Sequence, residues 1–277
     1  MIEFYKMSGS GNDFILIDNR QGQVEAAIGA ISVVDFVQAV CTPKISVGAD
    51  GLILIQESTK ADFGWRFFNA DGSEVEMCGN GGRCAARFAF LKGIAKDKLS
   101  FETVAGIIDA EVKGDIVKLR LTDPFDLRTD ETIRIDGRDY PVNSISTGVP
   151  HVVFYVEDLD AFDVFYIGRN IRYHDNYQPR GTNANFVKSL DRRNMMVRTY
   201  ERGVEDETLA CGTGSVASVL ISAAKGLVDS PVAVQVKSGE KLNIYFEKTS
   251  TGFEKIYLEG KAKVVNEGRL WDEAYNK

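Results

Sequence analysis

The sequence predicts an α+β fold of two similar domains, each with mostly antiparallel strands wrapped around one central helix. Three observations support this prediction: an internal repeat, short runs of alternating apolar residues, and one apolar helical run in each half. The 277 residues also suffice for about two domains of ordinary size. The two halves are therefore expected to descend from one duplicated unit.

The internal repeat centres on two cysteines. Cys78 in MCGNGGRC and Cys211 in ACGTG lie 133 positions apart, and each precedes a glycine-rich turn. The same offset, without a gap, aligns Glu74 with Glu207, Gly48 with Gly181, Gly106 with Gly239, and Lys92-Gly93 with Lys225-Gly226. Near the start the register slips, so that Gly11 aligns with Gly148. Weak identity in a sustained register is typical of an old duplication.

Each half alternates short strands with one helix. We expect helices from about Gly81 to Lys92 and from about Gly214 to Lys225, and because both are apolar on most sides they should be buried. Turn residues at 113–115 and 237–239 favour hairpins. The strands are expected at FILID, LILIQE and WRFFN in the first half, and at VVFYV, ANFVKS, MVRTYE, VAVQVK and LNIYFE in the second.

The predicted domain boundaries follow from the repeat. The first domain is expected to comprise residues 1–122 together with about 265–277, and the second residues 123–264. The crossover is placed near Thr122-Asp123-Pro124, and the C-terminal segment is expected to return to the first domain.

Composition excludes several classes of function. The net charge of −7 argues against nucleic acid and acidic membranes as partners, because both would repel the chain. No run of 18 apolar residues and no signal peptide is recognisable, so a cytoplasmic protein is expected. Four cysteines in so long a chain argue against a disulfide framework.

The position of Cys78 and Cys211 indicates reactive thiols. The backbone N–H groups at a helix start are unsatisfied and the helix dipole is positive there, which lowers the pKa of a cysteine from about 8.5. The following glycines leave these N–H groups uncovered, so the same place can hold a carboxylate. Cys41 and Cys84 are instead expected to be buried filler. A zinc site is disfavoured, because the sequence has no Cys-x-x-Cys and only two histidines.

Two equivalent thiols suggest a reaction on two faces of one substrate. Inversion of a carbon stereocentre is such a reaction, since one base removes a proton and an acid on the opposite side delivers another. Each sulfur would then lie roughly 3 to 3.5 Å from the carbon, and the two sulfurs about 6 to 7 Å apart.

The longer motifs resemble those of the diaminopimelate epimerases, in the cofactor-independent racemase and epimerase family. The resemblance runs through nearly the whole chain, and its motifs are SGSGNDFILID, FNADGSEVEMCGNGGRC, PHVVF, GTNANFV and YERGVEDETLACGTGS. It implies interconversion of LL- and meso-diaminopimelate in lysine and cell-wall precursor synthesis. It also implies that no cofactor such as pyridoxal phosphate and no metal is used, and that the protein is a homodimer.

The resemblance implies a role for each matching residue. Cys78 and Cys211 correspond to the paired base and acid. Gly79-Asn80 and Gly212-Thr213 correspond to the helix starts that hold the carboxylate of the reacting carbon and stabilise its developing charge. The residues that correspond to the grip on the distal end of the substrate are Asn12, Asn69, Asn183, Glu201 and Arg202. Arg202 suits a carboxylate and Glu201 an ammonium. His151 and Glu201 correspond to groups that tune the thiols.

The sequence departs from the family pattern in three places, which puts distal recognition in question. Val149 stands where an asparagine is usual, Gly51 where a glutamine is common, and the loop GVEDET is one residue longer.

Three alternatives stay open. Asn12 and Asn69 would be ordinary turn residues in any protein. A proline or hydroxyproline racemase would share the two-thiol chemistry, but a monofunctional substrate gives Arg202 and Glu201 nothing to bind. A thiol-disulfide redox protein could use the same cysteines, but it would need no asparagine-rich pocket.

Two neighbouring thiols predict a reversible sensitivity to oxidation. We expect oxidation to inactivate the protein and dithiothreitol to restore it, because sulfurs about 6 to 7 Å apart can form a disulfide when no substrate separates them. Turnover is measured before and after each treatment. Indifference to both reagents would contradict two neighbouring thiols.

Overall fold

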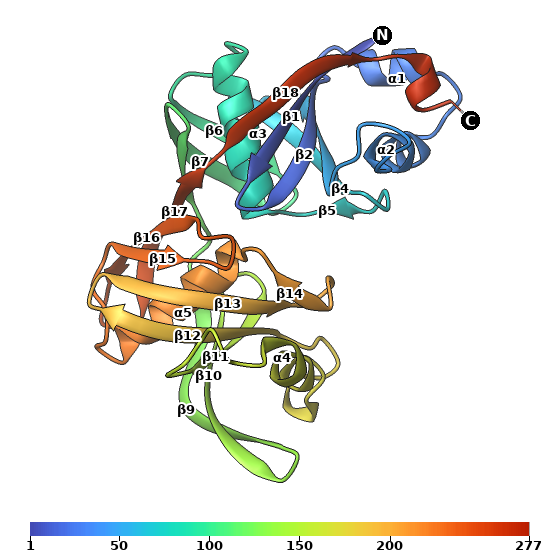
Figure 1. Cartoon of the computed structure of the whole chain (residues 1–277). Helices are drawn as coiled ribbons and strands as arrows, with labels where there is room; N and C mark the ends of the chain where they lie inside the picture. Colours follow the sequence, from blue (N-terminus) through green and yellow to red (C-terminus); the bar gives the residue numbers. More distant parts are fainter. Residues whose placement is uncertain (277) are drawn as a thin grey trace. The chain divides into compact units, whose positions relative to one another are not determined.

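The computed structural model describes residues 1–276 and divides into two compact units (Figure 1). Unit 1 is Met1–Leu119 with Gly260–Lys277, and unit 2 is Arg120–Glu259. The boundaries expected from the sequence, after residues 122 and 264, lie a few residues later in the chain than the observed ones, which follow Leu119 and Glu259. The chain changes unit within two strands, β8 (Ile116–Arg120) and β17 (Phe253–Lys261), where the apolar alternation of the sequence gives no signal.

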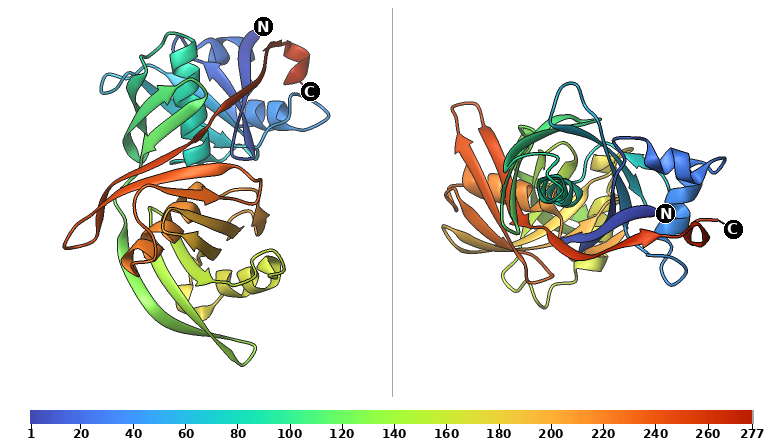
Figure 2. Two further views of the ribbon diagram at one scale, coloured as in Figure 1. Left: turned by 60° about the vertical axis from the view of Figure 1, so that its left-hand side comes forward. Right: turned by 90° about the horizontal axis from the view of Figure 1, so that it is seen from above.

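Unit 1 is a sheet wrapped around the helix α3. In Figure 2 the view from above shows α3 ringed by strands, and α3 contacts β1, β2, β3 and β7. The elements are β1 (Ile2–Gly9), β2 (Asn12–Asp18), α1 (Gln23–Ile28), α2 (Val33–Cys41), β3 (Gly51–Gln56), β4 (Phe63–Asn69), β5 (Glu74–Val75), α3 (Gly79–Leu91), β6 (Lys98–Thr103), β7 (Gly106–Lys113) and β8, with β18 (Lys263–Leu270) and η2 (Asp272–Ala274) from the end of the chain.

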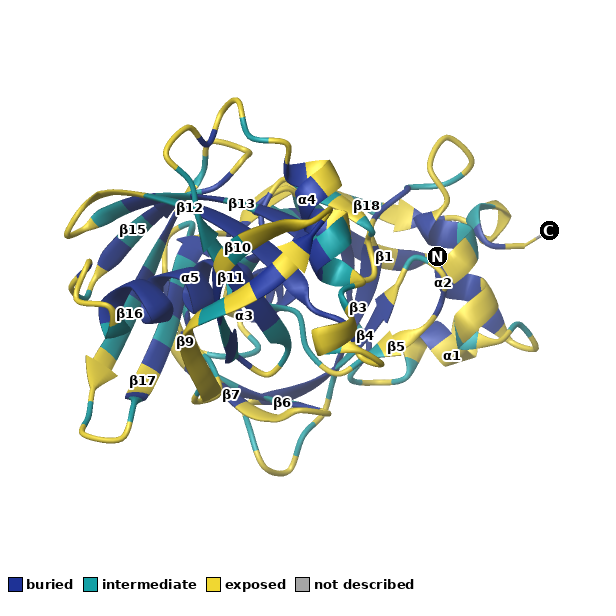
Figure 3. Cartoon of the chain, turned by 90° about the horizontal axis from the view of Figure 1, so that it is seen from below, coloured by how far each residue is buried: buried dark blue, intermediate teal, exposed yellow. Residues whose placement is uncertain are grey.

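Unit 2 is a second sheet wrapped around the helix α5, which contacts β10, β11, β12, β13 and β16. Figure 3 shows α5 as a buried helix. The elements are β9 (Phe125–Ile135), β10 (Arg138–Ser146), β11 (Pro150–Tyr155), α4 (Val164–Arg172), η1 (Asp175–Tyr177), β12 (Asn183–Asp191), β13 (Asn194–Glu201), β14 (Asp206–Thr208), α5 (Gly212–Ala224), β15 (Val232–Gln235), β16 (Lys241–Lys248) and β17.

The two units have the same order of strand pairing. In unit 1, β2 pairs parallel with β3 and β4 parallel with β6, and the pairs β1–β2, β3–β4, β4–β5, β6–β7 and β7–β8 are antiparallel. Unit 2 repeats this pattern from β10 to β17. The C-terminal strand β18 pairs with β1 as β9 pairs with β10. The predicted α+β fold, with mostly antiparallel strands around a central helix, is confirmed.

The offset between the repeats is not constant. In unit 1 the guanidinium of Arg66 binds the carboxylate of Glu74 through two bonds of 2.9 Å, and in unit 2 Arg198 binds Glu207 at 2.6 and 2.8 Å. These equivalent partners are 8 residues apart in the first case and 9 in the second. The gapless offset predicted from Gly48 onward is therefore wrong before β5. The chain needs one more residue to return from Tyr200 to its partner Glu207 than from Phe68 to its partner Glu74.

The helices differ slightly from prediction. α3 and α5 each begin two residues earlier and end one residue earlier than expected, with Cys78 and Cys211 as their N-caps. The poor helix propensity of glycine hid the first turn of each helix. The sequence prediction did not include α2 or α4, although Ser32 and Asp163 cap them by accepting from the backbone N–H of Asp35 and Tyr166. No helix within residues 1–276 is long and apolar enough to span a membrane.

Candidate active site

The predicted site residues fall into two half-sites, one in each unit. Unit 1 holds Cys78, Gly79, Asn80, Asn12 and Asn69. Unit 2 holds Cys211, Gly212, Thr213, His151, Asn183, Glu201 and Arg202. Each half-site is therefore described within its own unit.

In unit 1 the start of α3 leaves backbone donors open. The first intrahelical bond runs from the N–H of Gly82 to the carbonyl oxygen of Cys78 at 2.8 Å, so the preceding helical N–H groups have no acceptor in the helix. The end of β1 packs closely on this turn, because a Cβ atom on Gly9 would lie 2.9 Å from the carbonyl oxygen of Asn80. Only glycine fits there, and the open N–H groups are held at a fixed place beside Cys78.

The side chains of Asn12 and Asn80 meet beside this helix start. Asn12 begins β2, directly after the turn residues Ser10 and Gly11, whose φ angles of 54° and 96° suit a tight hairpin. The amide nitrogen of Asn80 donates to the amide oxygen of Asn12 at 2.8 Å. The amide nitrogen of Asn12 in turn donates to the Asp50 carboxylate at 2.9 Å. Both predicted residues thus belong to one hydrogen-bonded group.

Asn69 lies at the end of β4 and is bound within its own turn. Its amide nitrogen donates to the hydroxyl of Ser73 at 3.2 Å, and its backbone N–H to the Ser73 carbonyl at 2.9 Å. The next residue, Ala70, donates its N–H to the carbonyl oxygen of Asp50 at 3.0 Å. The turn therefore sits beside the residue that holds Asn12, and turn formation by itself accounts for the bonds of Asn69.

In unit 2 the start of α5 follows the same plan with a different support. The N–H of Ser215 donates to the carbonyl oxygen of Cys211 at 3.0 Å, and the Cys211 sulfur lies 3.6 Å from the hydroxyl of Thr213. A Cβ atom on Gly214 would lie 2.2 Å from the amide oxygen of Asn185 and 3.2 Å from the Cys211 sulfur. Asn185 thus lies directly beneath the first turn of α5, next to the thiol.

Asn185 is a residue that the sequence prediction missed. Its side chain is 1% exposed, and its amide oxygen accepts from the Thr199 hydroxyl at 3.0 Å. Its amide nitrogen donates to the Val152 carbonyl at 2.9 Å and lies 3.2 Å from Nδ1 of His151. The signal was a polar residue among buried apolar ones in the expected strand ANFVKS.

These contacts fix the state of His151. Because the Asn185 nitrogen is a donor, Nδ1 of His151 accepts and the proton of the neutral ring resides on Nε2. Burial, and secondarily the positive charge of Arg202, lowers the pKa of His151 to about 3. Nε2 is buried and has no hydrogen-bond partner within residues 1–276. The ring is therefore neutral at pH 7 and carries an unused donor.

Three of the residues predicted to grip the distal end, Asn183, Glu201 and Arg202, lie in unit 2 and are linked by hydrogen bonds or by sequence. Asn183 accepts from the backbone N–H of Arg202 at 2.8 Å and donates to the Pro150 carbonyl at 3.1 Å. The Arg202 guanidinium donates to the Arg180 carbonyl at 3.0 Å. Burial raises the pKa of the Glu201 carboxyl. Asn183 thus orients the backbone that carries Glu201 and Arg202.

Gly51, one of the two positions that depart from the family pattern, is closely packed. A Cβ atom on Gly51 would lie 2.5 Å from the Phe68 carbonyl oxygen and 2.8 Å from the Phe67 ring. The Phe67 ring therefore occupies the space that a side chain at position 51 would need. Val149 lies in the turn between β10 and β11, where its carbonyl accepts from the N–H of Thr147 at 3.1 Å.

The remaining cysteines are buried as expected. Cys41 is 1% exposed and Cys84 is fully buried, and none of the four cysteines forms a disulfide. Burial raises the pKa of the Cys41 thiol to about 12, so this thiol is unreactive at neutral pH. Within residues 1–276 no group of three or more His, Cys, Asp or Glu side chains could hold a metal ion.

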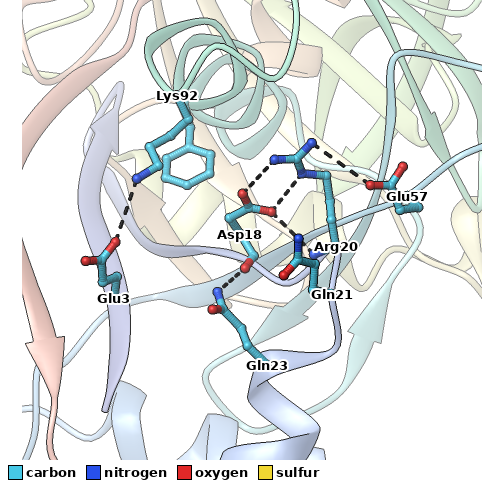
Figure 4. Close-up of a pocket in the computed structure, with 8 residues that line it drawn as sticks. Glu3, Asp18, Arg20, Gln21, Gln23, Glu57 and Lys92 are labelled. Carbon is cyan, nitrogen blue, oxygen red and sulfur yellow. Dashed lines mark hydrogen bonds and ion pairs between the residues drawn. The ribbon is translucent and has the colours of Figure 1, made fainter.

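Each unit has one cavity of note. One of about 420 Å³ in unit 2 is lined by His151 and Thr182. Another of about 220 Å³ in unit 1 lies at the C-terminal end of α3, about 20 Å along the helix from Cys78 (Figure 4). Its charged groups pair with one another, as Arg20 does with Asp18 at 2.9 Å and Lys92 with Glu3 at 3.8 Å. The second cavity is therefore separate from the thiol chemistry.

Comparison with known proteins decides between the family alternatives. The sequence pattern of the diaminopimelate epimerase family matches residues 4–124 and 143–265. The chain belongs to this family. It is 48% identical to the diaminopimelate epimerase of Aquifex aeolicus, over 98% of this chain and 99% of that one. It is 46% identical to the enzyme of the same name from Archaeoglobus fulgidus, over 86% and 87% of the two chains.

Solved structures extend the likeness at the level of the fold. A phenazine biosynthesis protein of the PhzF family from Bacillus anthracis superposes with a TM-score of 0.72 at 18% identity, over 98% of this chain and 99% of that one. A probable proline racemase from Agrobacterium radiobacter superposes with a TM-score of 0.71 at 13% identity, over 99% and 96%. The racemase alternative thus shares the fold, whereas the sequence likeness is to the diaminopimelate epimerases.

The neutral, buried His151 predicts a pH dependence of stability. In the folded state its pKa is lowered to about 3 from 6.5, so the unfolded chain binds this proton more readily and stability falls as the pH drops below about 6.5. Between pH 7 and pH 5 the free energy of unfolding of the unmodified protein should fall. We expect this fall to be smaller in His151→Asn, by up to about 2 kcal/mol. Urea unfolding at both pH values measures this.

The matched control is the other histidine, His174, which is partly exposed. A pH dependence that changes in His151→Asn but not in His174→Asn would assign the effect to His151. Identical pH profiles for all three proteins would show that His151 does not carry the effect.

Proposed function

We propose that the chain interconverts LL- and meso-diaminopimelate by proton exchange with two thiols. Membership of the diaminopimelate epimerase family supports the reaction. The observation that supports the mechanism is that both units present a cysteine as the N-cap of a buried helix with a glycine-rich first turn. The presence of one such cysteine in each unit is explained if both cysteines act on the same substrate carbon.

The proposed reaction needs only proton transfers. One cysteine, as the thiolate, takes the α-proton of the substrate and becomes a thiol, while the bonding electrons remain on the carbon. The other cysteine, as a thiol, then delivers its proton to the opposite face and becomes a thiolate. Cys78 and Cys211 exchange these roles when the reaction runs in reverse.

The helix starts are proposed to stabilise the intermediate. Removal of the α-proton increases the negative charge on the adjacent carboxylate. The N–H groups of Gly79-Asn80 and of Gly212-Thr213 are preorganised donors for that charge, and they lie next to the two thiols in sequence. The positive ends of two helix dipoles also favour the thiolate form of each cysteine.

His151 and Glu201 are proposed to influence the protonation of the thiols. A neutral imidazole with an unused Nε2–H can stabilise a thiolate by donating to it, whereas protonation of this ring is disfavoured by its lowered pKa. A carboxyl whose pKa is raised by burial can hold or release a proton nearer to neutral pH. Glu201 and Arg202 are also proposed to bind the distal ammonium and carboxylate of the substrate.

The homodimer implied by the family resemblance is likewise a proposal for this chain. Light scattering of the purified protein would give its mass in solution. A single species at the 30.6 kDa of one chain would contradict it.

Removal of either thiol tests the mechanism. We expect Cys78→Ala and Cys211→Ala each to reduce epimerisation by at least about 10³-fold, because a proton donor or acceptor is lost from one face. Cys41→Ala and Cys84→Ala, which remove buried thiols of no proposed chemical role, are the controls and should keep most of the activity. The measurement separates meso- from LL-diaminopimelate after incubation, because the remaining thiol could still exchange the α-hydrogen with solvent on its own face without inverting the carbon. Retained turnover in either of the first two variants would refute the two-thiol mechanism.

A further inference from the structure

A guanidinium is fully buried beneath the first half-site. Arg83 lies on α3, five residues after Cys78, and its side chain is 0% exposed. A buried charge is costly unless hydrogen bonds compensate it, so its partners indicate its role. Arg83 was not among the residues predicted to form the site.

The partners of Arg83 lie next to the predicted substrate contacts. One guanidinium nitrogen, Nη2, donates to the amide oxygen of Asn80 at 2.9 Å and to the hydroxyl of Ser10 at 2.6 Å. Ser10 is the first residue of the turn that leads into Asn12. The same guanidinium therefore holds both the helix start and the hairpin turn.

A continuous chain of hydrogen bonds runs from this cation to an anion. It passes from Arg83 to the oxygen of Asn80, from the nitrogen of Asn80 to the oxygen of Asn12, and from the nitrogen of Asn12 to the carboxylate of Asp50, with donor to acceptor distances of 2.9, 2.8 and 2.9 Å. The carboxylate of Asp50 also accepts from the backbone N–H of Asp13 at 3.1 Å.

The two ends of this chain determine the direction of every bond in it. A guanidinium can only donate and an ionised carboxylate can only accept. The Asn80 oxygen must therefore face Arg83, and the Asn12 nitrogen must face Asp50. Reversing either amide would place two acceptors or two donors against each other, and bonds that run in one direction strengthen one another.

We infer that Arg83 and Asp50 are positioning residues that fix Asn12 as a hydrogen-bond donor toward the substrate. The Asn12 nitrogen carries two hydrogens, and Asp50 takes one. Asn12 is partly exposed, and the bond to Asp50 is the one that its nitrogen donates among the hydrogen bonds of residues 1–276, so its second hydrogen is available to a ligand. Asn12 consequently recognises a carboxylate oxygen of the substrate and rejects an ammonium group. This inference rests on the proposed function for the identity of the ligand.

A pair of substitutions can reverse the chain. Asn80→Asp keeps the acceptor for Arg83 but places a carboxylate oxygen against the oxygen of Asn12. Asn12 can avoid this contact between two acceptors only by rotating its amide group, and the rotation places its oxygen against the carboxylate of Asp50. We expect the thermal midpoint of this variant to fall by roughly 5 °C.

The second substitution, Asp50→Asn, supplies a donor for the reversed oxygen of Asn12. In the double variant Asn80→Asp/Asp50→Asn we expect the thermal midpoint to recover most of that loss. The KM for LL-diaminopimelate should nevertheless stay at least about tenfold raised, because Asn12 now presents its oxygen to the substrate carboxylate. A stable protein with a raised KM is a result that a purely structural role would not give.

Two controls match these changes. Asp109→Asn removes an exposed carboxylate on β7 and should leave both the thermal midpoint and KM unchanged. Arg83→Lys, which replaces the two-acceptor fork by a single ammonium, should raise KM, whereas Arg87→Lys one turn further along α3 should not.

Thermal midpoints and KM together decide the outcome. If the double variant is as unstable as the sum of its single variants, no directed chain links positions 80 and 50. If the double variant has both the thermal midpoint and the KM of the unmodified protein, substrate binding does not depend on the orientation of the Asn12 amide. If the proposed function is wrong, the unmodified protein will not turn over LL-diaminopimelate. The stability measurements would still test the chain of hydrogen bonds in that case.

Discussion

The architecture depends on unsatisfied backbone N–H groups at the starts of two buried helices. Because α3 and α5 are surrounded by strands, their first turns would be costly to bury without an acceptor. An anionic substrate group and a thiolate are acceptors of the required kind. The glycines in each first turn keep these donors uncovered, and the close packing of Gly9 and Gly214 fixes their position. The same groups that would destabilise an empty helix end are therefore those that we propose to bind the substrate carboxylate.

The two units support these helix starts by different means. In unit 1 a buried cation, Arg83, organises Asn80 and Ser10 from within the helix. The position that aligns with Arg83 in unit 2 is the apolar Val216, and there the support comes from Asn185 on the neighbouring strand β12, held by Thr199. The two units thus share one order of strands and helices but have different polar networks beside their central helices. One network is charged and directional, whereas the other is neutral and encloses a histidine.

The electrostatics of unit 2 follow from burial. His151 is neutral because it is buried and because the positive charge of Arg202 is near, and burial also makes Glu201 harder to ionise. Asn183 holds the backbone of Arg202, so the position of Arg202 and the state of the imidazole are linked through adjacent residues on β11, β12 and β13. A neutral histidine and a carboxyl whose pKa is raised suit the proposed reaction, which consists of proton transfers alone.

The sequence by itself determined the duplication, the fold class, both cysteine N-caps and the strands around them, because the glycine motifs and apolar periodicity are local signals. It missed α2 and α4, because weak helices leave little trace in a repeat. It showed that the loop GVEDET is long, but not that this loop shifts the register between the repeats. Only the tertiary structure decided that Arg83, Asp50 and Asn185 support the site. These residues act through hydrogen bonds between positions far apart in the chain, and no local pattern encodes which donor meets which acceptor.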